Sequence, residues 1–138
     1  MKKLVINPQS VFNSLQYGFS QAVAVEGGQR VLLSGQVGVD SDENTVGGDL
    51  TSQTNAAIDN IERVLAEIGG QLKHIIMMRI YIVESEKANQ AVITRILLRR
   101  FPSNPPATSW IFVSGLSVPG WLIEIEAEAI LPSVPENS

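Results

Sequence analysis

Three glutamates, Glu124, Glu126 and Glu128, alternate with apolar residues near the end of the 138-residue chain. In an extended segment, side chains two positions apart point to the same face, so these three carboxylates would form one row. Such a row could bind a cation or supply a general base that activates water. A solvated strand face carries the same pattern and is the commoner explanation.

Two further segments could shape a ligand cleft. Gly35 follows an apolar run, and a residue without a Cβ lets a ligand approach the backbone, although a β-bulge or bend is the commoner reason for glycine there. Residues 101–110, FPSNPPATSW, are ordered by prolines and could hold a side chain rigidly at a cleft. Viewed alone, this segment is more often a simple connection between a helix and a strand.

The residue types argue against several kinds of site. With no cysteine, the chain has no disulfide, zinc–thiolate centre or cysteine nucleophile, and this fits a reducing cytoplasm. The single histidine, His74, lies beside Lys73 at the entrance of a predicted strand and is interpreted as a surface residue. One histidine also argues against a transition-metal site or a Ser-His-Asp triad. We therefore predict no metal and no cofactor.

Composition and charge restrict the class of protein. The chain is 44% hydrophobic and 17% charged, as expected for a globular protein, and its net charge is −4. A negative chain does not favour nucleic-acid binding, which needs clustered Lys and Arg. The apolar run near the N-terminus stops at Asn7-Pro8, so we predict no signal peptide, and no window approaches the ~18 apolar residues of a membrane span.

Two helices are predicted. The first has Asp49 as its N-cap and ends at Gly69-Gly70, and the second covers residues 86–100. The apolar stripe of the first helix is predicted to be Ile58, Ile61, Leu65 and Ile68. The inward residues of the second are predicted to be Ala88, Val92, Ile96 and Leu97. Arg95, Arg99 and Arg100 suit the C-terminal end of that helix.

Strands are predicted at residues 30–34, 74–84, 110–113 and 121–130, with 4–7 and 20–25 completing the sheet. The strand at 30–34 is predicted to end at Gly35. Strands and helices in this order predict an α+β fold in which two helices cover one face of a mixed sheet. Residues 1–131 are expected to form a single domain, and residues 132–138 a frayed tail.

Five blocks in this order resemble the YjgF/Rid family over nearly the whole chain. They are Ser20-Gln21-Ala22-Val23, Ser34-Gly35-Gln36-Val37, the helix from Gln53 to Asn60, the Pro106-Ala107-x-Ser109 turn, and Glu124-Ile125-Glu126-Ala127. The resemblance implies a chorismate-mutase-like fold. It also implies a homotrimer around a central barrel, with small-molecule clefts between subunits.

The best-known branch of this family hydrolyses enamines and imines. The resemblance implies that Thr108 stands where that branch has the arginine that clamps the substrate carboxylate, and Phe19 where it has a cleft tyrosine. Trp110 replaces a residue that is often cysteine, and Thr94 falls on the position of a helix asparagine. These four residues are the expected substrate-binding side chains, but three of the four positions have lost polar or reactive groups.

Gly35 and Glu124 match the family, and the resemblance implies that Glu124 positions the hydrolytic water. Two functions stay open: a divergent homologue that is not an efficient 2-imino acid deaminase, and a residual imine or enamine hydrolase. A third, the endoribonuclease activity attached to some family names, is weaker because the chain is acidic and lacks a pair of histidines.

Overall fold

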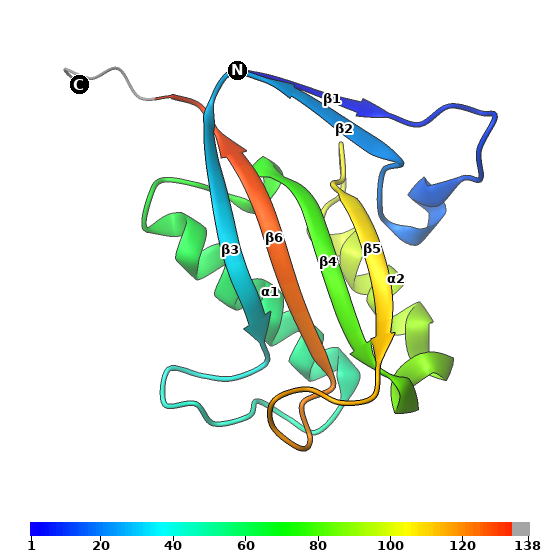
Figure 1. Ribbon diagram of the computed structural model, residues 1–138, viewed down its shortest axis with the longest axis vertical. Coiled ribbons are helices and arrows are strands. Elements are labelled where there is room, and N and C mark those ends of the chain that lie inside the picture. Colours follow the sequence, from blue (N-terminus) through cyan, green and yellow to red (C-terminus); the bar gives the residue numbers. More distant parts are fainter. Residues whose placement is uncertain (134–138) are drawn as a thin grey trace.

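The computed structural model describes residues 1–133, and the predicted tail lies largely outside them, since residues 134–138 are not described. The strands are β1 (Lys2–Ile6), β2 (Ala22–Glu26), β3 (Gln29–Val37), β4 (Ile75–Val83), β5 (Ala107–Val113) and β6 (Ile123–Leu131). The α-helices are α1 (Leu50–Ala66) and α2 (Gln90–Arg100). Short 3-10 helices are η1 (Ser14–Tyr17), η2 (Leu72–His74) and η3 (Glu84–Asn89). Figure 1 shows their arrangement.

The main sheet has the strand order β3-β6-β4-β5. Strand β6 is antiparallel to both β3 and β4, whereas β4 and β5 are parallel, so the sheet is mixed. Both α-helices lie on one face of it, and the other face is open in the described chain (Figure 1). The predicted α+β architecture with two helices on one face is confirmed.

The core fills the space between the helices and the sheet. In β6 the period of two places Ile123, Ile125 and Ala129 at 0% exposure, while the glutamates between them point to the open face. Each fully buried isoleucine contributes about 1.5–3 kcal/mol of transfer free energy. The alternation read from the sequence therefore sets which face of the sheet meets the helices.

Helix α1 begins where predicted. The Asp49 carboxylate accepts the backbone N–H of Ser52 at 2.6 Å, and this hydrogen bond lowers the pKa of Asp49. Ile58, Ile61 and Leu65 are fully buried. Ile68 was wrongly placed on the buried stripe: it lies beyond the last helical residue and is 49% exposed.

The second helix differs from its prediction because residues 84–89 form η3. A 3-10 turn has about three residues, so residues within it leave the stripe of an α-helix, and Ala88 is exposed rather than buried. The inward side of α2 is formed by Ile93, which was not predicted, together with Ile96 and Leu97.

Two predictions about strands were wrong. Strand β3 does not end at Gly35 but continues to Val37 through a register shift between Leu33 and Gln36, so the β-bulge explanation of this glycine is confirmed. Strands β1 and β2 do not complete the main sheet. They pair with each other along five residues, and the Ser20–Ala107 bridge just before β2 and the Lys3 ammonium, which donates to Ile75 O at 3.3 Å, connect them to it.

Candidate functional site

Glu124 packs against the β3 bulge. A Cβ added to Gly35 would lie 2.8 Å from Glu124 Cδ and 2.9 Å from its Oε1. Only glycine leaves room for the carboxylate beside the β3 backbone at this point. We call Gly35 and Glu124 together the Glu124 site.

The other two glutamates on the open face have partners. The Tyr81 hydroxyl donates to Glu126 Oε1 at 2.5 Å, and this hydrogen bond is the main cause that raises the pKa of Tyr81. Glu128 forms ion pairs with Arg30, whose Nη2 lies 2.6 Å from Oε1, and with Arg79, whose Nη1 lies 3.3 Å from Oε2. The hydrogen bond from Arg30 is the main reason why the pKa of Glu128 is lowered. Within residues 1–133, Glu124 is the one carboxylate of the row that forms no ion pair.

A second group of side chains surrounds a hollow of about 290 Å³ at the edge strand β5. Its lining residues, which we call the ring pocket, are Tyr17, Phe19, Gln90, Thr108 and Trp110. The rings of Phe19 and Trp110 are tilted by 51° with centroids 6.1 Å apart. The Trp110 indole N–H donates to Thr108 Oγ1 at 3.1 Å. None of the lining side chains carries a formal charge at neutral pH.

Backbone contacts bring the ring pocket together. Gly18 has φ +93°, and a Cβ there would lie 2.7 Å from Leu97 Cβ, so this glycine lets η1 pack closely on α2. The next residue, Phe19, therefore emerges beside α2. Ser20 N–H donates to Pro106 O at 2.9 Å, which ties the same segment to the beginning of β5. The proline-containing segment connects α2 to β5, as the commoner interpretation of its sequence expects, and it leads directly into the lining residues Thr108 and Trp110.

The two groups lie on opposite faces of the sheet. Paired residues on neighbouring strands project to the same side. Trp110 pairs with Ile80, which pairs with the buried Ile125, so Trp110 belongs to the helix-covered face. Thr108 likewise pairs with the buried Met78.

Glu124 pairs instead with Tyr81, on the open face. One chain therefore does not bring Glu124 into the ring pocket.

Two lining residues were missed by the sequence interpretation. Tyr17 lies two residues before Phe19 and brings a phenol to the pocket. Gln90 lies at the first turn of α2, and its Nε2 donates to Lys87 O at 3.1 Å. Thr94, one turn further along α2, is half-buried but does not line the ring pocket. Because residues four apart share one face of a helix, the position of Thr94 could have pointed to Gln90.

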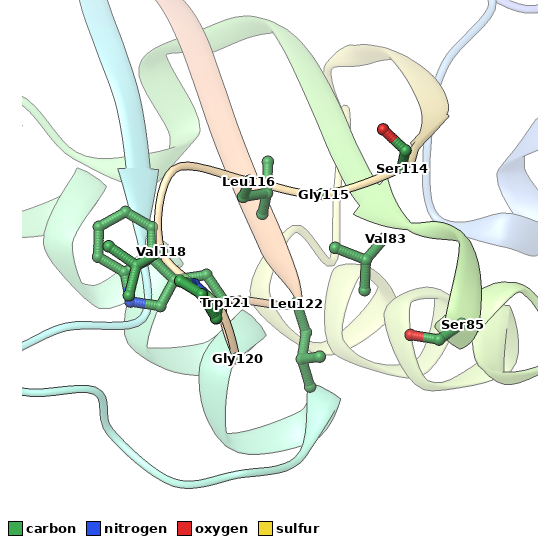
Figure 2. A pocket seen from close by; sticks show the side chains of 10 residues that line it. Val83, Ser85, Ser114, Gly115, Leu116, Val118, Gly120, Trp121 and Leu122 are labelled. Atoms are coloured by element: carbon green, nitrogen blue, oxygen red, sulfur yellow. The ribbon is translucent and has the colours of Figure 1, made fainter.

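Another hollow, of about 340 Å³, lies under the loop 114–122 that leads into β6. Figure 2 shows its lining side chains, with Val83 and Ser85 opposite the loop residues. The loop is held by Gln53, which is fully buried: its Nε2 donates to Gly120 O at 2.9 Å, and its Oε1 accepts Leu122 N–H at 2.8 Å. Because Glu124 follows two residues later, Gln53 fixes the backbone that enters the Glu124 site.

His74 has a structural contact that the sequence did not indicate. Its Nδ1 accepts the backbone N–H of Gln71 at 3.0 Å. Partial burial, followed by the charges of Lys73 and Lys3, lowers its pKa. The histidine belongs to the turn before β4 rather than to either group of candidate residues.

Residues 13–131 match the family model described as Endoribonuclease L-PSP. A crystal structure from Yersinia pestis, described as a protein of unknown function of the conserved Rid family, YyfB, is 35% identical with a TM-score of 0.90. It covers 95% of this chain and 100% of its own. Protein DfrA of Myxococcus xanthus is 32% identical over 81% of this chain and 84% of its own length. The 3-aminoacrylate deaminase RutC of Acinetobacter baylyi is 31% identical over 72% and 77%, respectively.

No helix among residues 1–133 is both long and apolar enough to span a membrane. Within the same residues, no group of three or more His, Cys, Asp or Glu side chains is arranged to hold a metal ion.

Proposed function

Because the chain belongs to the Endoribonuclease L-PSP family, the YjgF/Rid family, we propose that it forms a homotrimer with small-molecule clefts between neighbouring chains. Each cleft would combine the Glu124 site of one chain with the ring pocket of the next. The same cleft would turn over 2-imino acids poorly, because Thr108 stands in place of the clamping arginine.

The separation of the two groups by the sheet is the observation that carries this proposal. Glu124 projects from the open face and Trp110 from the helix-covered face, so a second chain is needed to bring them together. The open face also carries Leu32, which is 67% exposed, and Ile111, which is 37% exposed. Apolar side chains on such a face favour burial against another chain.

Thr108 sets the expected weakness towards carboxylates. Hydrogen bonds to charged groups are worth about 1.5–3 kcal/mol each, and a bidentate arginine makes two of them. Losing even one of these two hydrogen bonds would weaken binding of an amino-acid-derived imine roughly tenfold to a hundredfold. The Thr108 hydroxyl can replace neither the charge nor the planar fork.

A residual imine hydrolase is the second candidate, and the Glu124 site favours it. In such a reaction Glu124 would take a proton from water as the water oxygen attacks the imine carbon, and would return that proton to the nitrogen, giving a carbinolamine; the hydroxyl proton of the carbinolamine then passes to the leaving nitrogen. The carbon–nitrogen bond then breaks, giving a carbonyl compound and ammonia. The similarity to a 3-aminoacrylate deaminase supports this chemistry. A net charge of −4 gives no comparable support to RNA cleavage.

The test compares hydrolysis of 2-iminopropionate by the wild-type protein and by Thr108→Arg. We expect the variant to exceed the wild type in kcat/KM by roughly tenfold or more. Thr108→Lys is the matched control, because it adds the charge without the bidentate fork and should gain less. Wild-type turnover equal to that of Thr108→Arg would contradict the proposed weakness.

The assembly is tested separately by light scattering of the purified chain. A mass three times that of the 15.0 kDa chain is expected. A monomer at micromolar concentration would contradict the interchain cleft, whatever the result with imines.

A further inference from the structure

The ring pocket has the hydrogen-bonding capacity for one particular kind of ligand. We propose that it binds an uncharged planar ring that presents a carbonyl oxygen next to an N–H group, as a cyclic amide does. This inference names the ligand class of the proposed cleft and so rests on the proposed function.

The aromatic side chains favour a flat ligand. The Phe19 and Trp110 ring centroids are 6.1 Å apart with the planes at 51°, and Phe12 meets Phe19 edge-on at 6.3 Å, so the ring of Phe19 has two aromatic neighbours. A tilted pair of this kind offers one ring face and one ring edge to a guest, which is the arrangement aromatic rings prefer among themselves. The hollow of about 290 Å³ is at the small end of ligand sites, which suits a single ring.

Thr108 is left with a donor to offer. Its Oγ1 accepts the Trp110 indole N–H at 3.1 Å, so that contact orients the hydroxyl oxygen and leaves the hydroxyl hydrogen available. A ligand carbonyl oxygen is the matching acceptor.

Gln90 is left with an acceptor to offer. Its Nε2 donates to Lys87 O at 3.1 Å, and this contact fixes which end of the amide is the nitrogen. The Oε1 is then the end available to a ligand, and an N–H is the matching donor. Thr108 and Gln90 together thus complement a neighbouring carbonyl and N–H.

The ring pocket offers no cation to an anionic ligand, and the Glu124 carboxylate of the neighbouring chain would add a negative charge to the proposed cleft. Placing a carboxylate among uncharged side chains costs its desolvation without a compensating ion pair. The nearby ammonium of Lys87 lies 5.7 Å from the centre of the Phe112 ring, outside the lining residues. An uncharged cyclic amide satisfies both the hydroxyl and the amide without this desolvation.

Trp110 itself can report binding. The chain has two tryptophans, so Trp121→Phe leaves Trp110 as the single indole fluorophore. We would titrate this protein with 2-pyridone, which has the adjacent carbonyl and N–H, and with pyridine-2-carboxylate, a planar anion of similar size. We expect 2-pyridone to bind at least about tenfold more tightly.

The Gln90→Met variant, titrated with 2-pyridone and with N-methyl-2-pyridone, tests whether Gln90 Oε1 accepts the ligand N–H. The methylated probe lacks the N–H, so Gln90→Met should weaken 2-pyridone about threefold to tenfold and leave N-methyl-2-pyridone unchanged. Thr108→Val should weaken both probes by a similar factor, since both keep the carbonyl, while Thr108→Ser keeps the hydroxyl and serves as its control. A merely structural role for Gln90 would move both probes equally.

Three outcomes would overturn the inference. They are tighter binding of pyridine-2-carboxylate, equal loss of both pyridones in Gln90→Met, or no quenching of Trp110 by any probe up to its solubility. Each of these leaves the interchain cleft standing if the protein is a trimer and Thr108→Arg gains imine turnover. A monomer without that gain would instead count against the proposed function itself.

Discussion

The Glu124 site and the ring pocket are built by different means. The Glu124 site depends on backbone: a bulge in β3, a glycine without a side chain, and the pairing of β6 with β3. The ring pocket depends on side chains contributed by β5, α2 and the segment around η1. In our proposal, the Glu124 site keeps the family pattern, whereas the ring pocket departs from it at Phe19, Thr108 and Trp110. A single added Cβ at Gly35 would disturb the Glu124 site, whereas the ring pocket is defined by the side chains that line it.

Trimers assembled from two different variants test most directly whether the Glu124 site and the ring pocket of one cleft come from different chains. The Thr108→Arg/Glu124→Gln double variant has the restored arginine but no carboxylate base, and the wild type has the base but no arginine. If each cleft takes one group from each of two neighbours, random 1:1 mixed trimers should recover about a quarter of the Thr108→Arg activity. Hydrolysis of 2-iminopropionate after co-refolding measures this.

Each protein alone should be at least roughly tenfold below Thr108→Arg. A mixture no more active than the sum of its parents would place both groups of a cleft in one chain.

Gly35→Ala should damage the Glu124 site selectively. Its Cβ would fall 2.8 Å from Glu124 Cδ, and the flexible glutamate side chain would move away rather than the sheet. In the Thr108→Arg background we expect kcat to fall by about tenfold or more, because a misplaced base loses much of its contribution.

Gly48→Ala is the matched control, since a Cβ there meets nothing within 4 Å. It should leave kcat unchanged. If Gly35→Ala also leaves kcat unchanged, the bulge does not position the Glu124 carboxylate for the reaction.

Gln53→Leu should separate stability from ligand binding. The substitution leaves the Leu122 N–H and the Gly120 carbonyl without their buried partner, which costs about 1–3 kcal/mol. Urea unfolding of this variant and of the exposed control Gln9→Leu measures the difference. Ring-pocket affinity for 2-pyridone should stay unchanged, because Gln53 contacts no ring-pocket residue through its hydrogen bonds. A parallel loss of affinity would show that the two regions are coupled.

The smallest expected effect concerns acid stability. The folded state holds the pKa of Glu128 below its ordinary value of 4.5, so its stabilisation is present above pH 4.5 and is lost as the pH falls through the lowered value. Glu128→Gln should therefore flatten the decline of unfolding free energy between neutral pH and pH 3, followed by circular dichroism. Glu67→Gln, on the exposed end of α1, should leave that decline as in the wild type.

Most of the fold could be read from periodicity, because burial of one face imposes it. The alternation in β6 and the cap at Asp49 were both sufficient to place their elements. The exposed Ala88 and the separate pairing of β1 with β2 were not predictable, since a 3-10 turn and a strand partner are decided by tertiary contacts. For the site, family blocks pointed to residues on both faces, but only strand register shows that the sheet separates Glu124 from Trp110.

The bulge in β3 adds one residue that the pairing of β3 with β6 does not need but that the position of Glu124 does. Leu33 pairs with Ala127 and Gln36 with Ile125, so β3 uses three steps where β6 uses two. A chain shortened by one residue at Ser34 could form an unbroken ladder with Leu33 and Gln36 on their present faces. Gly35 would then pair with Glu126, and Glu124 would lose the space beside Gly35 that its carboxylate now occupies. The extra residue in β3 is therefore tied to the position of Glu124, since the pairs on either side of it keep their faces with or without it.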